Sequence, residues 1–355
     1  MRKFVWLILI AVLGTGGWLA WALLTPVEPA GPTIVMLRPG FSTRRIAAEL
    51  KAAGIIRSQE AFVLWHYYHH GRSLKAGEYL FDKSANIVDI QKRLRRGDVY
   101  LHTVVVPEGY TMFDIARAVE EAGLGPADEF LKVAQSDTSL IADIAPNAKS
   151  LEGYLFPETY QFSRMMSMQD IAAAMVKQFR HVGRQIGLVP VTLDSEGKAV
   201  DPSISPGEIP PPPNGPRAVD IEQTVIMASI VEKETAVPEE RPEVASVYYN
   251  RLAKHIALAA DPSIIYAELL AGTYQGALHH ADMSFTSAYN IYRNVGFFFG
   301  PIANPGCSSL EAAMHPAQTD YYYFVADAQG HHRFARSLQE HNKNVDAYRK
   351  AMRHR

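Results

Sequence analysis

The sequence predicts an α+β protein that follows a single N-terminal membrane helix. Three observations predict this fold class: an uncharged apolar run opens the chain, a strand–helix–helix–strand pattern occurs twice in the first half, and helices alternate with strand-like runs in the second half. With 355 residues, the chain is long enough for two or three domains. Its 35 basic and 37 acidic residues nearly balance, so no nucleic-acid partner is expected.

The first element is a stretch of 21 uncharged residues, Phe4 to Leu24, which is enough to cross a bilayer as a helix. Arg2 and Lys3 precede it, and the next basic residue is Arg38. The positive-inside rule therefore predicts a single-pass protein of the cytoplasmic (inner) membrane, with its N-terminus inside and its body outside, in the periplasm or otherwise extracytoplasmic. We expect residues 1–30 to form the cytoplasmic stub and the anchor. A cleaved signal peptide is the alternative.

The first half of the chain contains an internal duplication. GFSTRRIAAELKAAGI at 40–55 matches GYTMFDIARAVEEAGL at 109–124, with Ser42 and Thr111 at the N-cap position of a helix. Both helices end in Ala-Gly-hydrophobic, where the glycine suits the C′ position.

Short β-like runs flank both copies. They lie at 33–37 and 78–81 in the first copy, and at 102–106 and 159–162 in the second. We therefore expect two strand–helix–helix–strand units, at about 33–100 and 101–185.

The stretch 194–216 is polar and rich in proline, and it ends in PGEIPPPPNGP. Such a composition excludes a helix or an interior strand, so a stiff loop is expected there.

The segment from Asp220 to Thr235 predicts one helix, with Asp220 as its N-cap and ASIVEKET (228–235) at its end. At roughly 100° per residue, Glu232 and Glu234 point about 200° apart, so only one of them faces a given cleft. Both faces are apolar, and periodicity does not choose between them. Burial raises a carboxyl pKa, and a carboxyl that stays protonated near neutral pH acts as a general acid.

Further helices are expected at about 239–254, 308–314 and 338–352, with a strand-like run at Tyr321–Ala326.

Six motifs follow one another along the chain: LEGYLFPETY (151–160), ASIVEKET (228–235), NRL (250–252), DPSIIY (261–266), GPIANPG (300–306) and HPA (315–317). In this order they resemble the MltG/YceG family of endolytic murein transglycosylases, membrane-anchored enzymes that cleave peptidoglycan glycan strands. The resemblance covers nearly the whole chain. It implies a LysM-like subdomain at 31–100, which either binds the glycan backbone or acts as a spacer, and a catalytic domain at 101–355. It further implies action on nascent strands beside cell-wall synthases, without a cofactor.

The resemblance also chooses Glu234 as the catalytic acid. Glu232 is then expected to be a salt-bridged carboxylate, with Arg241 or Arg251 as its partner. The implied reaction needs one carboxyl group, because the muramyl C6 hydroxyl of the substrate replaces the second carboxylate of ordinary glycosidases.

Four residues are candidates for substrate binding. Tyr289 and Asn290 match a groove motif of the family, Asp261 is the one plausible second carboxylate, and Asn250 offers an amide. Each has a structural alternative: core or turn residues for the tyrosine and the two asparagines, and a loop cap before Pro262 for Asp261.

The chain departs from the family pattern at two places. Leu258-Ala259-Ala260 replaces Leu-Gln-Ser/Thr, and Gly296-Phe297-Phe298-Phe299-Gly300 replaces Gly-Leu-Pro-Pro-Gly. Ile291 also replaces a customary threonine. We expect altered groove detail, with at least one of the phenylalanines buried.

The sequence suggests three alternative hypotheses. His66 with His70 and the pairs at 279–280 and 331–332 invite a metal site, but HExxH and Cys/His clusters are absent from the sequence, and no metal is expected. Cys307 with His315 suggests a thiol nucleophile, but Ser308 and Glu311 form a capping-box pattern instead. An anchored peptidoglycan-binding scaffold without catalysis is the remaining alternative.

Overall fold

The computed structural model describes residues 2–69, 71–188, 220–296 and 299–353, so the proline-rich stretch 194–216 and Phe297–Phe298 lie outside the described residues. The chain divides into two compact units. Unit 1 is Met1–Thr103 with Gln161–Met166, and unit 2 is Val104–Tyr160 with Ser167–Arg355.

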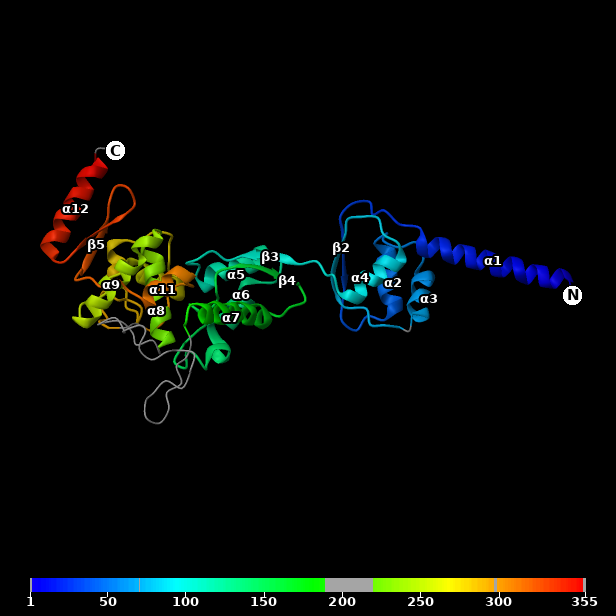
Figure 1. Ribbon diagram of the computed structural model, residues 1–355, viewed down its shortest axis with the longest axis horizontal. Helices are drawn as coiled ribbons and strands as arrows, with labels where there is room; N and C mark the ends of the chain where they lie inside the picture. The colour runs from blue at the N-terminus through cyan, green and yellow to red at the C-terminus, as the bar shows by residue number, and fades with distance from the viewer. Residues whose placement is uncertain (1, 70, 189–219, 297–298, 354–355) are drawn as a thin grey trace. The chain divides into compact units, whose positions relative to one another are not determined.

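Unit 1 holds a two-stranded antiparallel sheet covered by three short helices, and the N-terminal helix leads into it (Figure 1). Thr33 pairs with Phe81 and Leu37 with Gly77 across the sheet. Its elements are α1 (Arg2–Leu24), β1 (Thr33–Leu37), α2 (Thr43–Ala52), α3 (Gln59–Tyr68), β2 (Gly77–Phe81) and α4 (Ile87–Arg96).

Helix α1 is long and apolar enough to cross a membrane. Most of its side chains are exposed, and only Ala22 and Leu23, in its last turn, are buried. A span with this surface fits a lipid environment better than water.

Unit 2 repeats the pattern of unit 1 and then adds the second half of the chain. Its elements, in order, are β3 (His102–Val105), α5 (Met112–Glu121), α6 (Ala127–Ser136), η1 (Thr138–Ile141), β4 (Thr159–Phe162), α7 (Met168–Gln185), α8 (Ile221–Glu234), η2 (Pro238–Glu240), α9 (Arg241–Ala253), α10 (Asp261–Ala271), η3 (His280–Ser284), α11 (Cys307–Met314), β5 (Tyr323–Ala326), β6 (His332–Ala335) and α12 (Leu338–Arg353). The division between the units passes through β3 and β4, which pair with each other.

The internal duplication is confirmed at the level of local structure. Ser42 caps α2 by accepting from the Arg45 amide, and Thr111 caps α5 by accepting from the Asp114 amide. Gly54 and Gly123 follow the two helices with φ values of +72° and +74°, the left-handed conformation that favours glycine.

Helix α8 lies at the centre of unit 2. The Asp220 side chain accepts from the Gln223 amide as the predicted N-cap, and residues 224–231 are all buried. The helix packs against α9, α10 and α11. Gly153 approaches it with a φ of +88°, and a Cβ there would lie 2.7 Å from Val225 and 2.6 Å from Pro301, so only glycine fits this approach.

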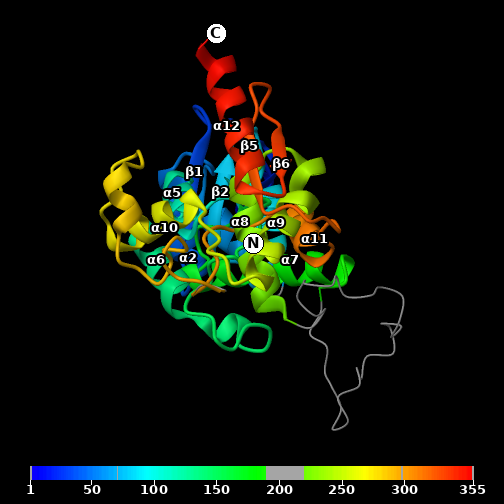
Figure 2. The same cartoon turned by 90° about the vertical axis from the view of Figure 1, so that its left-hand side faces the viewer.

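The last part of unit 2 is a β-hairpin with a helix beside it. β5 and β6 pair antiparallel, with Tyr323 opposite Ala335, and α12 packs against both strands (Figure 2). The predicted strand-like run at 321–326 is therefore β5, which begins two residues later than expected.

Two local predictions are wrong. Helix α11 begins at Cys307 with Gly306 at the N-cap and no side-chain cap, so Ser308 and Glu311 form no capping box. Asp261 is not in an extended loop. It is the first residue of α10, because Pro262 is tolerated in the first turn of a helix, where its missing N–H has no partner to lose.

Candidate active site

The two glutamates of ASIVEKET have different surroundings, as their angular separation on α8 predicts. Helix α8 ends at Glu234, and Thr235 adopts an extended conformation. Each carboxyl group therefore reaches a different set of partners.

Glu232 is held by an ion pair. Its Oε1 lies 2.9 Å from Nη2 of Arg241, and the two side chains are only 5% and 6% exposed. Its Oε2 accepts from the Gly306 amide at 2.9 Å. Both oxygens are thus occupied as acceptors, and the expected salt bridge goes to Arg241 rather than to Arg251.

Gly306 leaves room for a second carboxylate beside this ion pair. A Cβ at this position would lie 1.9 Å from a carboxylate oxygen of Glu108, whose other oxygen is 3.6 Å from Arg241. A side chain at Gly306 would make the half-exposed Glu108 side chain shift away from the arginine. The last glycine of GPIANPG, Gly306, therefore supports the structural Glu232 by donating its backbone amide.

Glu234 has the electrostatics of a proton donor. Burial raises its pKa to about 7, and the negative charge of Asp261 acts in the same direction. A hydrogen bond from the Tyr248 hydroxyl and the positive charge of Arg251 act in the opposite direction. The balance leaves a half-buried carboxyl group that titrates near neutral pH, as a general acid requires.

Tyr248 and Arg251 come from one face of α9, because they are three residues apart. Tyr248 is 2% exposed, and its ring packs edge-on against Phe324. Arg251 donates from Nε to the Tyr322 carbonyl at 2.6 Å and from Nη1 to the Leu258 carbonyl at 2.7 Å. The guanidinium is therefore fixed by backbone carbonyls, whereas an acidic partner was expected.

Asp261 and Tyr292 complete the cluster around Glu234. The Tyr292 hydroxyl donates to Asp261. Burial raises the pKa of Tyr292, and the charges of Asp261 and Glu234 act in the same direction. The amide of Ala259, which has a φ of +56°, donates to the Ile291 carbonyl. This bond ties the segment before Asp261 to the segment that carries Tyr292.

Asn250 and Asn290 are held by backbone groups. The Asn250 amide donates to the carbonyls of Thr319 and Tyr321, at 2.9 and 3.0 Å. Asn290 is fully buried. Its amide donates to two carbonyls of the preceding turn, and its side-chain oxygen accepts from the Tyr292 amide at 3.1 Å. These contacts match the turn alternative, and Asn290 positions Tyr292. Their role in substrate binding stays a prediction.

Tyr289 is 7% exposed and packs edge-on against Tyr266 and Phe299. Phe299 itself is 50% exposed and lies under the Lys149 ammonium. The sequence predicts that at least one of the three phenylalanines at 297–299 is buried. Phe299 is the one of them within the described residues, and it is exposed.

Three residues of this region were missed by reasoning from the sequence: Tyr248, Tyr292 and Glu152. In the sequence, Tyr248 and Tyr292 resemble ordinary core aromatics. The position of Tyr248, one helical turn before Arg251, is the signal that could have placed it near the site. Glu152 is fully buried, accepts from the Met112 amide at 2.9 Å and from Asn304 Nδ2 at 2.7 Å, and burial raises its pKa to about 8. It links the LEGYLFPETY and GPIANPG motifs through hydrogen bonds in the core.

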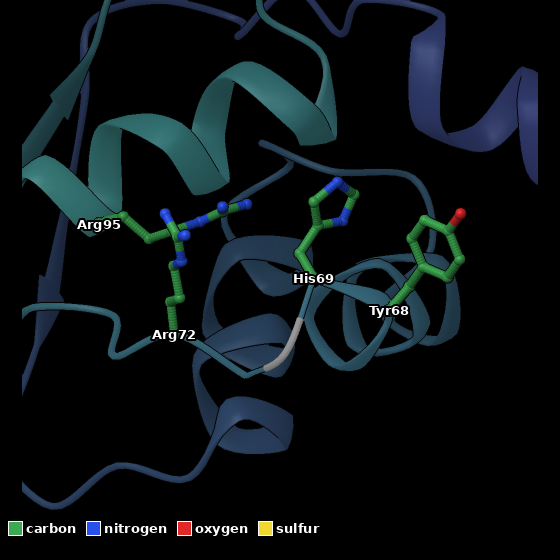
Figure 3. A pocket seen from close by; sticks show the side chains of 4 residues that line it. All are labelled: Tyr68, His69, Arg72 and Arg95. Carbon is green, nitrogen blue, oxygen red and sulfur yellow. The ribbon is translucent and has the colours of Figure 1, made fainter.

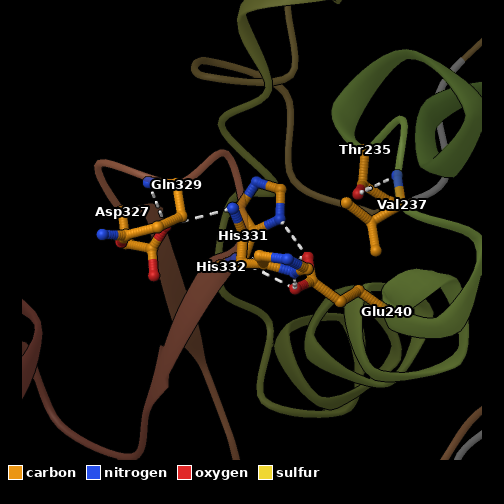
Figure 4. Close-up of polar contacts among 7 residues, drawn as sticks. All are labelled: Thr235, Val237, Glu240, Asp327, Gln329, His331 and His332. Atoms are coloured by element: carbon orange, nitrogen blue, oxygen red, sulfur yellow. Dashed lines mark hydrogen bonds and ion pairs between the residues drawn. The ribbon is translucent and has the colours of Figure 1, made fainter.

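The adjacent histidines His331 and His332 converge on Glu240 (Figure 4). Their Nδ1 atoms lie 2.9 and 2.7 Å from the two carboxylate oxygens, and the His332 amide also donates to that carboxylate. The hairpin is thereby tied to the turn that follows Glu234. Within the described ranges, no group of three or more histidine, cysteine, aspartate or glutamate side chains is arranged to hold a metal ion. Burial raises the pKa of Cys307, which is the opposite of thiol activation.

Comparison with known proteins identifies the family. The family described as YceG-like matches residues 35–347. The endolytic murein transglycosylase of Bacillus subtilis is 33% identical over 92% of this chain and 88% of its own length. Its counterpart in Streptococcus pneumoniae R6 is 27% identical over 97% of this chain, which spans 65% of that relative.

A solved structure shares the fold. A YceG-like protein of Listeria monocytogenes aligns with a TM-score of 0.55 and 30% sequence identity, over 88% of this chain and 98% of its own. Together with the match over residues 35–347, this establishes that the chain belongs to the YceG-like family.

Proposed function

We propose that the protein is an endolytic murein transglycosylase that cleaves the MurNAc–GlcNAc linkage of nascent peptidoglycan strands, leaves 1,6-anhydroMurNAc ends and so terminates strand growth. The observation that carries the proposal is the carboxyl group of Glu234, whose pKa burial raises to about 7. The names of the Bacillus and Streptococcus relatives support the same activity.

The proposed mechanism uses Glu234 twice. Its carboxyl group first donates a proton to the glycosidic oxygen, and the bond from that oxygen to muramyl C1 breaks. The muramyl C6 hydroxyl then forms a bond to C1, and the Glu234 carboxylate takes up the hydroxyl proton. The carboxyl group is restored and no water is consumed. A pKa near 7 suits both steps, because the group must give up and regain a proton at the same pH.

The surrounding residues have supporting roles in this proposal. Tyr248 and Arg251 stabilise the ionised form of Glu234 after its proton is transferred, and Asp261 favours the protonated form before transfer. Asp261 is also exposed at the start of α10, where it is available to sugar hydroxyls. Tyr289, Asn290 and Asn250 complete the predicted binding set.

The proposal includes a domain arrangement. Residues 1–30 form the cytoplasmic stub and the single-pass anchor, 31–100 a LysM-like subdomain that binds the glycan backbone, and 101–355 the catalytic domain in the periplasm. The apolar, exposed surface of α1 supports the anchor. Cell-wall synthases are proposed partners.

Mass analysis of digested glycan strands tests the function. Each cleavage is expected to give a product with an anhydromuramyl end, which is lighter by one water than the corresponding product of hydrolysis. Reducing ends would indicate a hydrolase, and binding to strands without any cleavage would indicate a scaffold. Either result would overturn the proposal.

A further inference from the structure

The end of α1 is built into unit 1. Ala22 and Leu23 belong to the buried core of the unit. Arg57 donates to the carbonyls of Thr25 and Pro26 at 2.8 and 3.0 Å, and its guanidinium lies 5.3 Å from the centre of the Trp21 ring. There is consequently no free linker between the apolar helix and the folded unit.

The length of α1 fixes the depth of this junction. A helix of 23 residues is about 34 Å long, and the hydrocarbon core of a bilayer is about 30 Å thick. If α1 crosses the membrane, its last turn lies in the headgroup layer, and the part of unit 1 beside that turn lies at the membrane surface.

Helices α3 and α4 both pack against α1, and α3 carries the exposed apolar face. Figure 1 shows α1 and α3 next to each other. The outward face of α3 carries Leu64, Tyr67 and Tyr68, which are 55%, 65% and 77% exposed. The rings of Trp65 and of the C-cap residue His69 lie tilted to each other, with ring centres 4.1 Å apart. Exposed aromatic side chains of this kind are typical of the membrane–water interface.

A pocket of about 510 Å³ opens at the end of this face and is lined by Tyr68, His69, Arg72 and Arg95. The guanidinium groups of Arg72 and Arg95 lie close to each other (Figure 3), and none of the described residues that line the pocket is acidic. Among the residues that the structure describes, neither arginine pairs with a carboxylate. The Nε of Arg95 is buried and has no hydrogen-bond partner.

We propose that the interfacial pocket formed by Tyr68, His69, Arg72 and Arg95 binds the phosphate of an anionic phospholipid in the membrane that α1 crosses. This inference rests on the proposed anchoring by α1. Two converging cations without an acid leave a net positive field, which a phosphate neutralises and a neutral N-acetylhexosamine does not. A lipid of that membrane supplies such a phosphate next to α3, which packs against α1, and the exposed tyrosines of α3 are placed to contact the glycerol and acyl region.

Native mass spectrometry of the detergent-solubilised full chain tests the proposal, with phosphatidylglycerol, phosphatidylcholine or inorganic phosphate added separately. The full chain is expected to bind phosphatidylglycerol in preference to phosphatidylcholine. The variant Arg72→Gln/Arg95→Gln is expected to weaken this binding about 25-fold, since each cation near a lipid surface contributes roughly fivefold. Arg72→Gln alone removes an exposed side chain and should cost about fivefold with the fold intact.

The matched control is Arg38→Gln/Arg44→Gln, which removes two exposed arginines of unit 1 that do not line the pocket. It should leave phosphatidylglycerol binding unchanged. Equal losses in both double variants, or no loss in either, would overturn the proposal. Displacement of phosphatidylglycerol by equimolar inorganic phosphate would show that the site takes free phosphate, and the lipid assignment would then be wrong.

Failure of this inference is distinguishable from failure of the proposed function. A full chain that cleaves glycan strands but ignores phosphatidylglycerol would refute the pocket alone. Membrane-extracted protein whose intact mass lacks the α1 residues would refute the anchoring.

Discussion

The hydroxyl of Tyr248 lowers the proton affinity of Glu234, so replacing Tyr248 by phenylalanine should change the pH dependence of catalysis. Burial raises the pKa of Glu234 to about 7, and the hydrogen bond from the Tyr248 hydroxyl is the largest effect that lowers it. The substitution Tyr248→Phe removes that hydroxyl and leaves the ring in place against Phe324.

The size of the change follows from the difference between two hydrogen bonds. A hydrogen bond to an ionised group contributes about 1.5–3 kcal/mol, and one to a neutral group about 0.5–1.5 kcal/mol. The ionised form of Glu234 therefore loses about 1–1.5 kcal/mol more than the protonated form, which corresponds to about one pKa unit. The pKa rises, and Glu234 stays protonated to higher pH.

The assay is kcat/KM for glycan-strand cleavage as a function of pH. Because the acid must carry its proton before the bond breaks, wild-type activity should fall as the pH rises through about 7. In Tyr248→Phe this alkaline limb should lie about one unit higher.

Tyr249→Phe is the matched control. Its hydroxyl donates to the Ala313 carbonyl at 2.9 Å, in the core and away from Glu234, so the pH profile should not move. An unmoved or lowered alkaline limb in Tyr248→Phe would refute the reasoning.

Three further predictions concern other carboxyl groups of unit 2. Glu232→Gln should lower the free energy of unfolding by up to about 3–5 kcal/mol, because the buried Arg241 loses its nearer, buried ion-pair partner and keeps only the half-exposed Glu108 at 3.6 Å. The fraction that remains folded should keep its activity; urea unfolding and an activity assay check this. Asp261→Asn should shift the alkaline limb of kcat/KM to lower pH, since the charge that raises the pKa of Glu234 is removed; an upward shift would contradict the assignment. Between pH 4.5 and about 8, the free energy of unfolding should fall by roughly 3–5 kcal/mol more in the wild type than in Glu152→Gln, because buried Glu152 keeps its proton in the folded state and releases it at lower pH in the unfolded state. Glu234 contributes a fall to both proteins, since its pKa is also raised. Parallel curves for the two proteins would contradict this prediction.

Local rules predicted much of the fold. Asp220 before an apolar run predicts the start of α8, and Ser42 and Thr111 predict the starts of α2 and α5; the structure confirms all three caps. These predictions succeed because a helix start is decided by a side chain and an amide three residues away. The cap predicted at Ser308 is absent, because α11 begins at Cys307 and Ser308 lies inside its first turn.

The surroundings of the candidate acid were less predictable, because they depend on contacts between distant segments. The sequence separates Glu232 from Glu234 by angle, but the choice of Arg241 as partner comes from the turn between α8 and α9. Tyr248 and Tyr292 read as core aromatics, and only the fold brings both hydroxyls to the carboxylates of Glu234 and Asp261. Glu152 and its partner Asn304 are 152 residues apart, so no local pattern reveals their bond.

The most direct test of the central claim is the activity of Glu234→Gln on peptidoglycan strands, with the release of anhydromuramyl ends measured by mass spectrometry. Glutamine keeps the shape of the side chain but has no carboxyl proton to donate. The account predicts a properly folded variant whose rate of product release falls by at least about 100-fold, the usual contribution of a general acid. Product release at the wild-type rate would contradict the assignment of Glu234 as the proton donor.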